Sequence, residues 1–74
     1  MVETFLVVFG SAQHAKDFCF ELHRRLRNVS SFRDDCCVLV YDASMYGQRE
    51  HILRLARSSS ASHVRAVVPK GIPK

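Results

Sequence analysis

The sequence predicts an α/β fold, in which two helices pack on a small parallel sheet of three strands in the order β-α-β-α-β. Three apolar runs, at 5–9, 36–41 and 64–68, have the β-branched and aromatic composition of strands that are buried on both faces, as in a parallel sheet. Two segments between them carry apolar residues at helical spacing. The chain has 74 residues, of which 47% are hydrophobic and 24% charged, which suits one small domain.

The first strand and the first helix have the clearest signals. Thr4–Phe9 is an unbroken apolar run after its first residue, and it ends at Gly10. Ser11 can then cap a helix over residues 12–28. The apolar stripe of this helix consists of Ala15, Phe18, Cys19, Leu22 and Leu26.

Residues 28–35 are polar, and they are expected to connect the first helix to the second strand. That strand covers residues 36–41, and Asp42 ends it. Because strands that are joined through a helix run parallel, the first strand is expected in the middle of the sheet.

The second helix is expected to begin near Gly47 or Gln48 and to fade over residues 58–62, which are rich in serine. Glu50 suits the positive end of its dipole. Its apolar residues are Ile52, Leu53, Leu55 and Ala56.

The last strand covers residues 64–68, and Pro69 stops it. Arg65 interrupts its apolar pattern, so this strand is expected towards an edge of the sheet. The domain is predicted to span residues 1–70, with a flexible tail at 71–74.

Length and charge favour a binding protein. A chain of this size holds one compact core but no deep, walled active site, so we do not expect an enzyme. The formal net charge of +4 attracts phosphate backbones and acidic surfaces.

The cysteines indicate where the protein resides. Cys19, Cys36 and Cys37 cannot all pair within one chain, so three free thiols and an intracellular location, cytoplasmic or nuclear, are expected. The longest apolar run, Phe5–Phe9, is far shorter than the roughly 20 residues of a membrane span, so no membrane partner is expected.

The candidate binding surface lies on the first helix, opposite its apolar stripe. A helical projection places Phe20 there among cations, an arrangement that can stack a base while holding its phosphates, or anchor an acidic protein. The alternative is that the 28–35 connection or the C-terminal tail covers this ring, with Phe32 as its neighbour. The candidate residues are Lys16, Phe20, His23, Arg24 and Arg27, with Arg49 and Arg54 from the second helix.

The ends of parallel strands are the other place to search for a ligand. Gly10 and Ser11 lead into a helix and could bind an anion there, although a plain helix cap explains them as well. This loop loosely resembles the phosphate loop of flavodoxin-like domains, but Gln13 and His14 occupy the family's small-residue positions. No cofactor is therefore expected. No metal site is expected either, because His14, His23, His51 and His63 are scattered along the chain. An enzyme or cofactor site would need Ser11, Asp42, Ser44 and Lys70 to converge.

The span from about Thr4 to Lys70 resembles the anticodon-binding domain of class II aminoacyl-tRNA synthetases and of their non-synthetase relatives. The matching stretches are Phe5–Gly10, Phe18–Leu22, Val38–Asp42 with the following Gly47-Gln48-Arg49, and Val64–Val68. The resemblance implies a non-catalytic module that binds RNA or protein.

The leading hypothesis is therefore a non-enzymatic module, a fragment or domain of a larger assembly, that recognises RNA or an acidic protein partner through the basic, aromatic-containing helix face. Two alternatives remain. One is a protein–protein interaction or signalling adaptor domain, because Toll/interleukin-receptor domains share the order of elements. The other is a flavodoxin-like fragment that binds phosphate or a cofactor.

Overall fold

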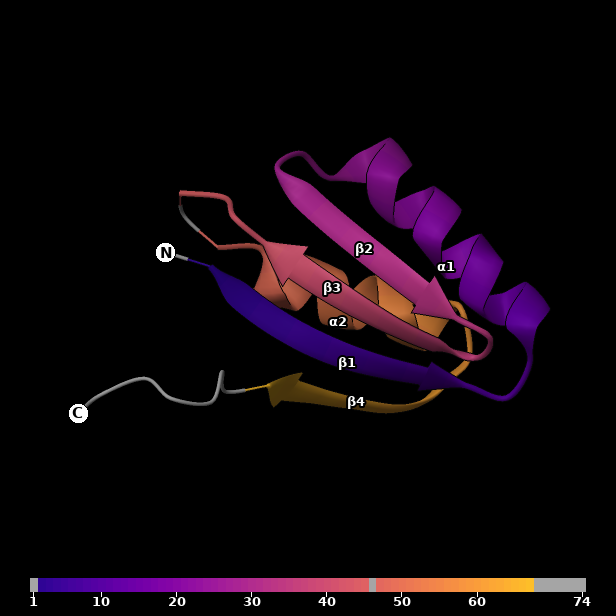
Figure 1. Ribbon diagram of the computed structural model, residues 1–74. Helices are drawn as coiled ribbons and strands as arrows, with labels where there is room; N and C mark the ends of the chain where they lie inside the picture. The colour runs from indigo at the N-terminus through magenta and orange to yellow at the C-terminus, as the bar shows by residue number, and fades with distance from the viewer. Residues whose placement is uncertain (1, 46, 68–74) are drawn as a thin grey trace.

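The computed structural model describes residues 2–45 and 47–67 of the chain. Four strands form one sheet in the order β2-β3-β1-β4, and every neighbouring pair is antiparallel (Figure 1). This is the double split β-α-β, or ferredoxin-like, arrangement. The elements are β1 (Glu3–Phe9), α1 (Ala12–Arg25), β2 (Val29–Asp34), β3 (Cys37–Asp42), α2 (Arg49–Ser58) and β4 (Ala61–Val67).

The predicted parallel sheet of three strands is wrong, and the polar segment at 28–35 is the reason. Val29–Asp34 forms the edge strand β2 instead of a connection, and a tight turn at Asp35, whose φ is 57°, folds the chain back into β3. Helix α1 therefore crosses over to β2, which is parallel to β1 but separated from it by β3. The hairpin makes β3 antiparallel to β1.

Two placements from the sequence are confirmed. Strand β1 lies inside the sheet between β3 and β4, and β4 is an edge strand. Strand β4 starts at Ala61, earlier than the predicted residue 64. The predicted tail lies among residues 68–74, outside the described part of the chain.

Helix α1 begins as predicted but ends earlier. The Ser11 side chain accepts a hydrogen bond from the backbone N–H of His14, which confirms the predicted N-cap. The helix stops at Arg25 and not at residue 28, because Leu26 takes an extended conformation and Asn28 has a φ of 60°. These two residues redirect the chain into β2.

Both helices pack on one face of the sheet, which we call the inner face (Figure 1). Phe9 of β1 meets Phe18 of α1 with ring centroids 5.2 Å apart. Ile52 and Ala56 bring α2 onto the same core. The remaining core residues are Phe5, Val7, Ala15, Leu22, Val38 and Val40.

The opposite face of the sheet, which we call the open face, carries no helix from the described residues (Figure 1). Strand register places its side chains in three rows that cross β2, β3, β1 and β4. The middle row is apolar for three of its four residues. The rows are Asp34, Cys37, Val8 and His63; Phe32, Leu39, Leu6 and Arg65; and Ser30, Tyr41, Thr4 and Val67.

The two phenylalanines of α1 test which side of the helix faces the core. Phe18→Ala should lower the free energy of unfolding by about 3–5 kcal/mol, because it opens a cavity beside Phe9. Phe20→Ala removes an exposed ring and should change it by about 0.5 kcal/mol or less. Urea denaturation measures both values, and a similar loss from the two variants would contradict the packing of α1.

Candidate functional site

Phe20 is 68% exposed and stands on the outer side of α1, away from the sheet. Lys16 and Arg24 are exposed four residues before and after it, so helical geometry puts a cation about 6 Å along the axis on either side of the ring. We call these three residues the α1 outer surface. Their placement agrees with the helical projection.

The alternative that Phe32 covers Phe20 is wrong. Phe32 projects from β2 onto the open face, where its ring packs edge-on against Tyr41 with centroids 5.7 Å apart. The two phenylalanines therefore lie on opposite sides of the sheet.

His23 joins the helix to the sheet edge. Its Nε2 lies 2.7 Å from the Ser31 hydroxyl of β2. This hydrogen bond gives the imidazole a structural role beside the α1 outer surface, although the ring remains exposed.

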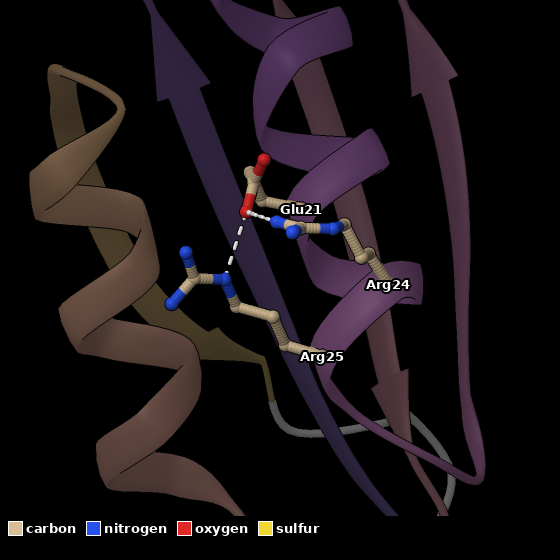
Figure 2. Close-up of polar contacts among 3 residues, drawn as sticks. All are labelled: Glu21, Arg24 and Arg25. Atoms are coloured by element: carbon tan, nitrogen blue, oxygen red, sulfur yellow. Dashed lines mark hydrogen bonds and ion pairs between the residues drawn. The ribbon is translucent and has the colours of Figure 1, made fainter.

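Glu21 forms ion pairs with two cations of α1 (Figure 2). Its Oε1 accepts from Arg25 Nε at 2.8 Å and from Arg24 Nη1 at 3.3 Å. Exposed pairs of this kind contribute little to stability, so either guanidinium can exchange the carboxylate for a phosphate at low cost.

Arg27 is not part of the helical surface on which the sequence placed it, because α1 ends at Arg25. It is exposed in the connection to β2, and its carbonyl oxygen accepts a hydrogen bond from Gln48 Nε2 at 2.9 Å.

Arg49 also lies apart from the other candidates. Its Nη2 is 2.6 Å from Glu3 Oε2, and its guanidinium lies 5.9 Å from the centre of the Phe5 ring. These contacts tie the start of α2 to the start of β1.

Arg54 belongs to a cationic hollow that the sequence did not predict. The hollow has a volume of about 210 Å³ and lies between the two helices, so two segments far apart in the sequence build it. Arg25 reaches it from α1, which brings it next to the Glu21 ion pairs. We call this the α1–α2 hollow, and it is lined by Arg25, His51, Arg54, Leu55 and Ser58.

Gly10 and Ser11 serve to start α1. The Ser11 hydroxyl already accepts from a backbone N–H of the first turn, at 3.2 Å. A side chain at Gly10 would meet no heavy atom within 4 Å, so no packing contact within the described residues requires glycine there. The helix cap explains Ser11.

Ser11 and Asp42 do not converge. Ser11 follows the end of β1, whereas Asp42 pairs with Glu3 at the beginning of β1, so they lie at opposite ends of the antiparallel sheet. Ser44 does reach Asp42, and Lys70 lies outside the described residues.

Asp42 is buried and holds the loop before α2. Its carboxylate accepts hydrogen bonds from the Ser44 hydroxyl at 2.7 Å, from the Ser44 N–H at 3.0 Å and from the Gln48 N–H at 2.7 Å. Burial by itself raises the pKa of Asp42, but these hydrogen bonds outweigh it and hold the pKa below its usual value.

The three cysteines are free thiols, as predicted. Cys37 is exposed on the open face, and Cys36 lies in the turn before β3. Partial burial and the adjacent Asp35 carboxylate raise the pKa of the Cys36 thiol, so the thiolate is disfavoured at neutral pH.

Within residues 2–45 and 47–67, no three His, Cys, Asp or Glu side chains gather as metal ligands would. Neither of the helices in that part of the chain has the length and apolar character to cross a bilayer. Comparison of the chain with protein-family models, curated proteins and solved structures gave no match. The resemblance to anticodon-binding domains therefore stays a prediction.

Acid titration tests the role of Asp42. Its pKa is lower in the folded chain than its ordinary value of about 3.9, so the unfolded state binds the proton first as the pH falls. Stability should be constant above about pH 5 and should decrease as the pH falls through that ordinary value towards the lower folded pKa.

Asp42→Asn should lower stability at neutral pH by about 1–3 kcal/mol, because an amide NH₂ would face a backbone donor. The variant should also lose less stability than the parent chain between pH 5 and pH 3. Urea denaturation at several pH values measures both effects, and equal acid dependence in the two proteins would contradict this role.

Proposed function

We propose that the protein is a non-enzymatic module that binds single-stranded RNA through the outer side of its helix layer. The observation that carries the proposal is the 68% exposure of Phe20 between two cations. A large ring in this position contributes little to the core, and exposed aromatic rings between cations are the usual platforms for unpaired bases.

The geometry suits a nucleotide. A base stacked on Phe20 leaves its phosphates near the cations that flank the ring, Lys16 and Arg24, each about 6 Å away along the helix axis. Neither cation belongs to the core. Lys16 is exposed, and Arg24 can exchange its exposed ion pair with Glu21 for a phosphate contact.

The α1–α2 hollow extends this surface towards α2. Glu21 and Arg25 lie on the α2 side of Phe20, and Arg25 with Arg54 offers two guanidiniums to one oxyanion. Guanidinium groups bind phosphate oxygens through paired N–H donors. An RNA strand that crosses α1 would therefore meet a stacking ring first and next a hollow lined by two guanidinium groups.

An acidic protein is the competing partner, since the same cations would attract carboxylates. The Phe20 ring favours RNA over an acidic protein. An exposed phenylalanine among cations can stack on a base, whereas it makes no comparable contact with a carboxylate.

The Phe20 variant tests the proposal by fluorescence anisotropy with a labelled eight-nucleotide single-stranded RNA. Phe20→Ala should raise the Kd by a factor that corresponds to about 1–3 kcal/mol of lost stacking. Phe32→Ala is the matched control, because that ring is 65% exposed on the opposite side of the sheet, and it should leave the Kd unchanged. Binding of polyglutamate but not of RNA would replace the proposal with an acidic protein partner.

Lys16→Ala separates phosphate contact from stacking in the same titration. It should reduce the slope of log K against log salt by about 0.7, the value for one phosphate of a single strand. Phe20→Ala should leave this slope unchanged. Equal slopes for all variants would contradict a phosphate contact at Lys16.

Glu21→Gln tests the ion pairs of Figure 2. The substitution removes a carboxylate that repels phosphate and releases Arg24 and Arg25, so the RNA affinity should rise several-fold at low salt. The gain should shrink as salt increases, because exposed charges are screened. Unchanged affinity at low salt would show that RNA does not approach this side of α1.

A further inference from the structure

The open face of the sheet is apolar where an uncovered face of a small protein is ordinarily polar. Leu6, Val8 and Leu39 are only half-buried, and Phe32 is 65% exposed. A hollow of about 240 Å³ lies above β3. It is lined mainly by Leu6, Phe32, Cys37 and Leu39, with Arg33 and Asp34 at its side.

The charges of the open face lie at its margins and have opposite signs. Asp34 stands on edge strand β2, and His63 and Arg65 stand on the other edge strand, β4. Most of the apolar residues, among them Leu6, Val8 and Leu39, belong to the two interior strands. A partner that fits this face therefore presents an apolar centre, a cation beside Asp34 and an acceptor beside His63.

We propose that this partner is a second copy of the chain, bound open face to open face about a two-fold axis that runs along the strands between β3 and β1. Such an axis places β2 of one copy over β4 of the other. Each row of side chains then faces the same row of the other copy. Asp34 then meets His63 of the copy, which can donate a ring N–H to the carboxylate. In the middle row, Arg65 lies over the ring of Phe32 of the copy, a cation–π geometry.

The same axis also fills the hollow. It places β1 of each copy over β3 of the other, so that Leu6 and Val8 project towards the 240 Å³ hollow. Aligned sheets of this kind pack about 10 Å apart with their strands within about 30° of each other.

A two-fold axis perpendicular to the strands is disfavoured, because of where the strand register places the charged residues of the open face. It would lay β4 over β4 and bring Arg65 against Arg65 of the copy, while Asp34 would face Ser30. Like charges in contact destabilise an interface, whereas the axis along the strands pairs every charge of the face with a complementary group.

The available area predicts a weak, transient association. Four strands at about 4.8 Å spacing and about 20 Å in length offer a face of roughly 400 Å² per copy in projection. Together the two copies bury roughly 800 Å², which is less than the roughly 1,200 Å² of the smallest stable interfaces and fits a weak, transient dimer. The dimer is therefore expected to form at high protein concentration and to dissociate on dilution.

Analytical ultracentrifugation of the full chain, without nucleic acid, tests the dimer. The mass should rise with concentration from the 8.4 kDa of one chain towards twice that value. Phe32→Lys should keep the protein monomeric, and Phe20→Lys, at a ring of similar exposure on the helix layer, should leave the association unchanged. A monomer at all concentrations, or equal effects of the two variants, would overturn the proposal.

A charge exchange tests the direction of the axis. Asp34→Lys and His63→Glu should each weaken self-association at least several-fold. Asp34→Lys places a cation beside His63 of the other copy. His63→Glu places a carboxylate beside Asp34 of the other copy. An equimolar mixture should restore dimers, because both corner contacts are then complementary. Circular dichroism confirms that each variant is folded, and a mixture that associates no better than its components would overturn this arrangement.

The dimer does not depend on the proposed RNA binding, since the two use opposite faces of the sheet. Two results together would assign the open face to RNA and overturn the dimer. Phe32→Lys would lose RNA affinity, and the parent chain would sediment as a monomer at every concentration.

Discussion

The two helices of residues 2–45 and 47–67 cover only one face of the sheet, and the rest of the described structure follows from that limit. Phe18 of α1 and Ile52 of α2 pack on the inner face, and both are fully buried there. Burial of apolar area is the main favourable term in folding, so this one-sided core supplies most of the stability of the domain. The same limit leaves Leu6 and Leu39 on a face that no helix of the described residues covers.

Asp42 fixes how the connecting segments are arranged around this core. Its carboxylate fixes the loop that leads from β3 to α2, and Gln48, which donates to it, also donates to the Arg27 carbonyl in the connection between α1 and β2. One buried carboxylate thus ties together the connections that precede both β2 and α2. A charged acceptor with several donors keeps its charge without an ion pair, which explains an acidic residue at this position.

Sequence patterns were reliable where local chemistry decides and failed where an edge or a tertiary contact decides. Ser11 caps α1, and Phe20 faces outwards, because capping and helical periodicity depend on near neighbours. Strand β2 was missed because an edge strand with mostly exposed residues has the composition of a loop. The apolar runs suggested a parallel sheet because Leu6 and Leu39 are apolar on a face that no helix of residues 2–45 and 47–67 covers. The α1–α2 hollow could not be predicted, since it exists only where two distant segments meet.

The two proposed surfaces lie on opposite sides of the sheet, and this separates their functions. Two sheets packed about 10 Å apart, each with a helix layer about 10 Å thick, put the two copies of Phe20 on outer surfaces roughly 30 Å apart. In the proposed dimer, a short RNA would reach only one of these rings, so its affinity would not depend on association of the chain. A longer strand would reach both, and its second contact would form at the high effective concentration set by the intervening nucleotides. If both proposals hold, self-association through the open face would make the RNA affinity depend on the length of the strand, although that face would not itself contact the nucleic acid.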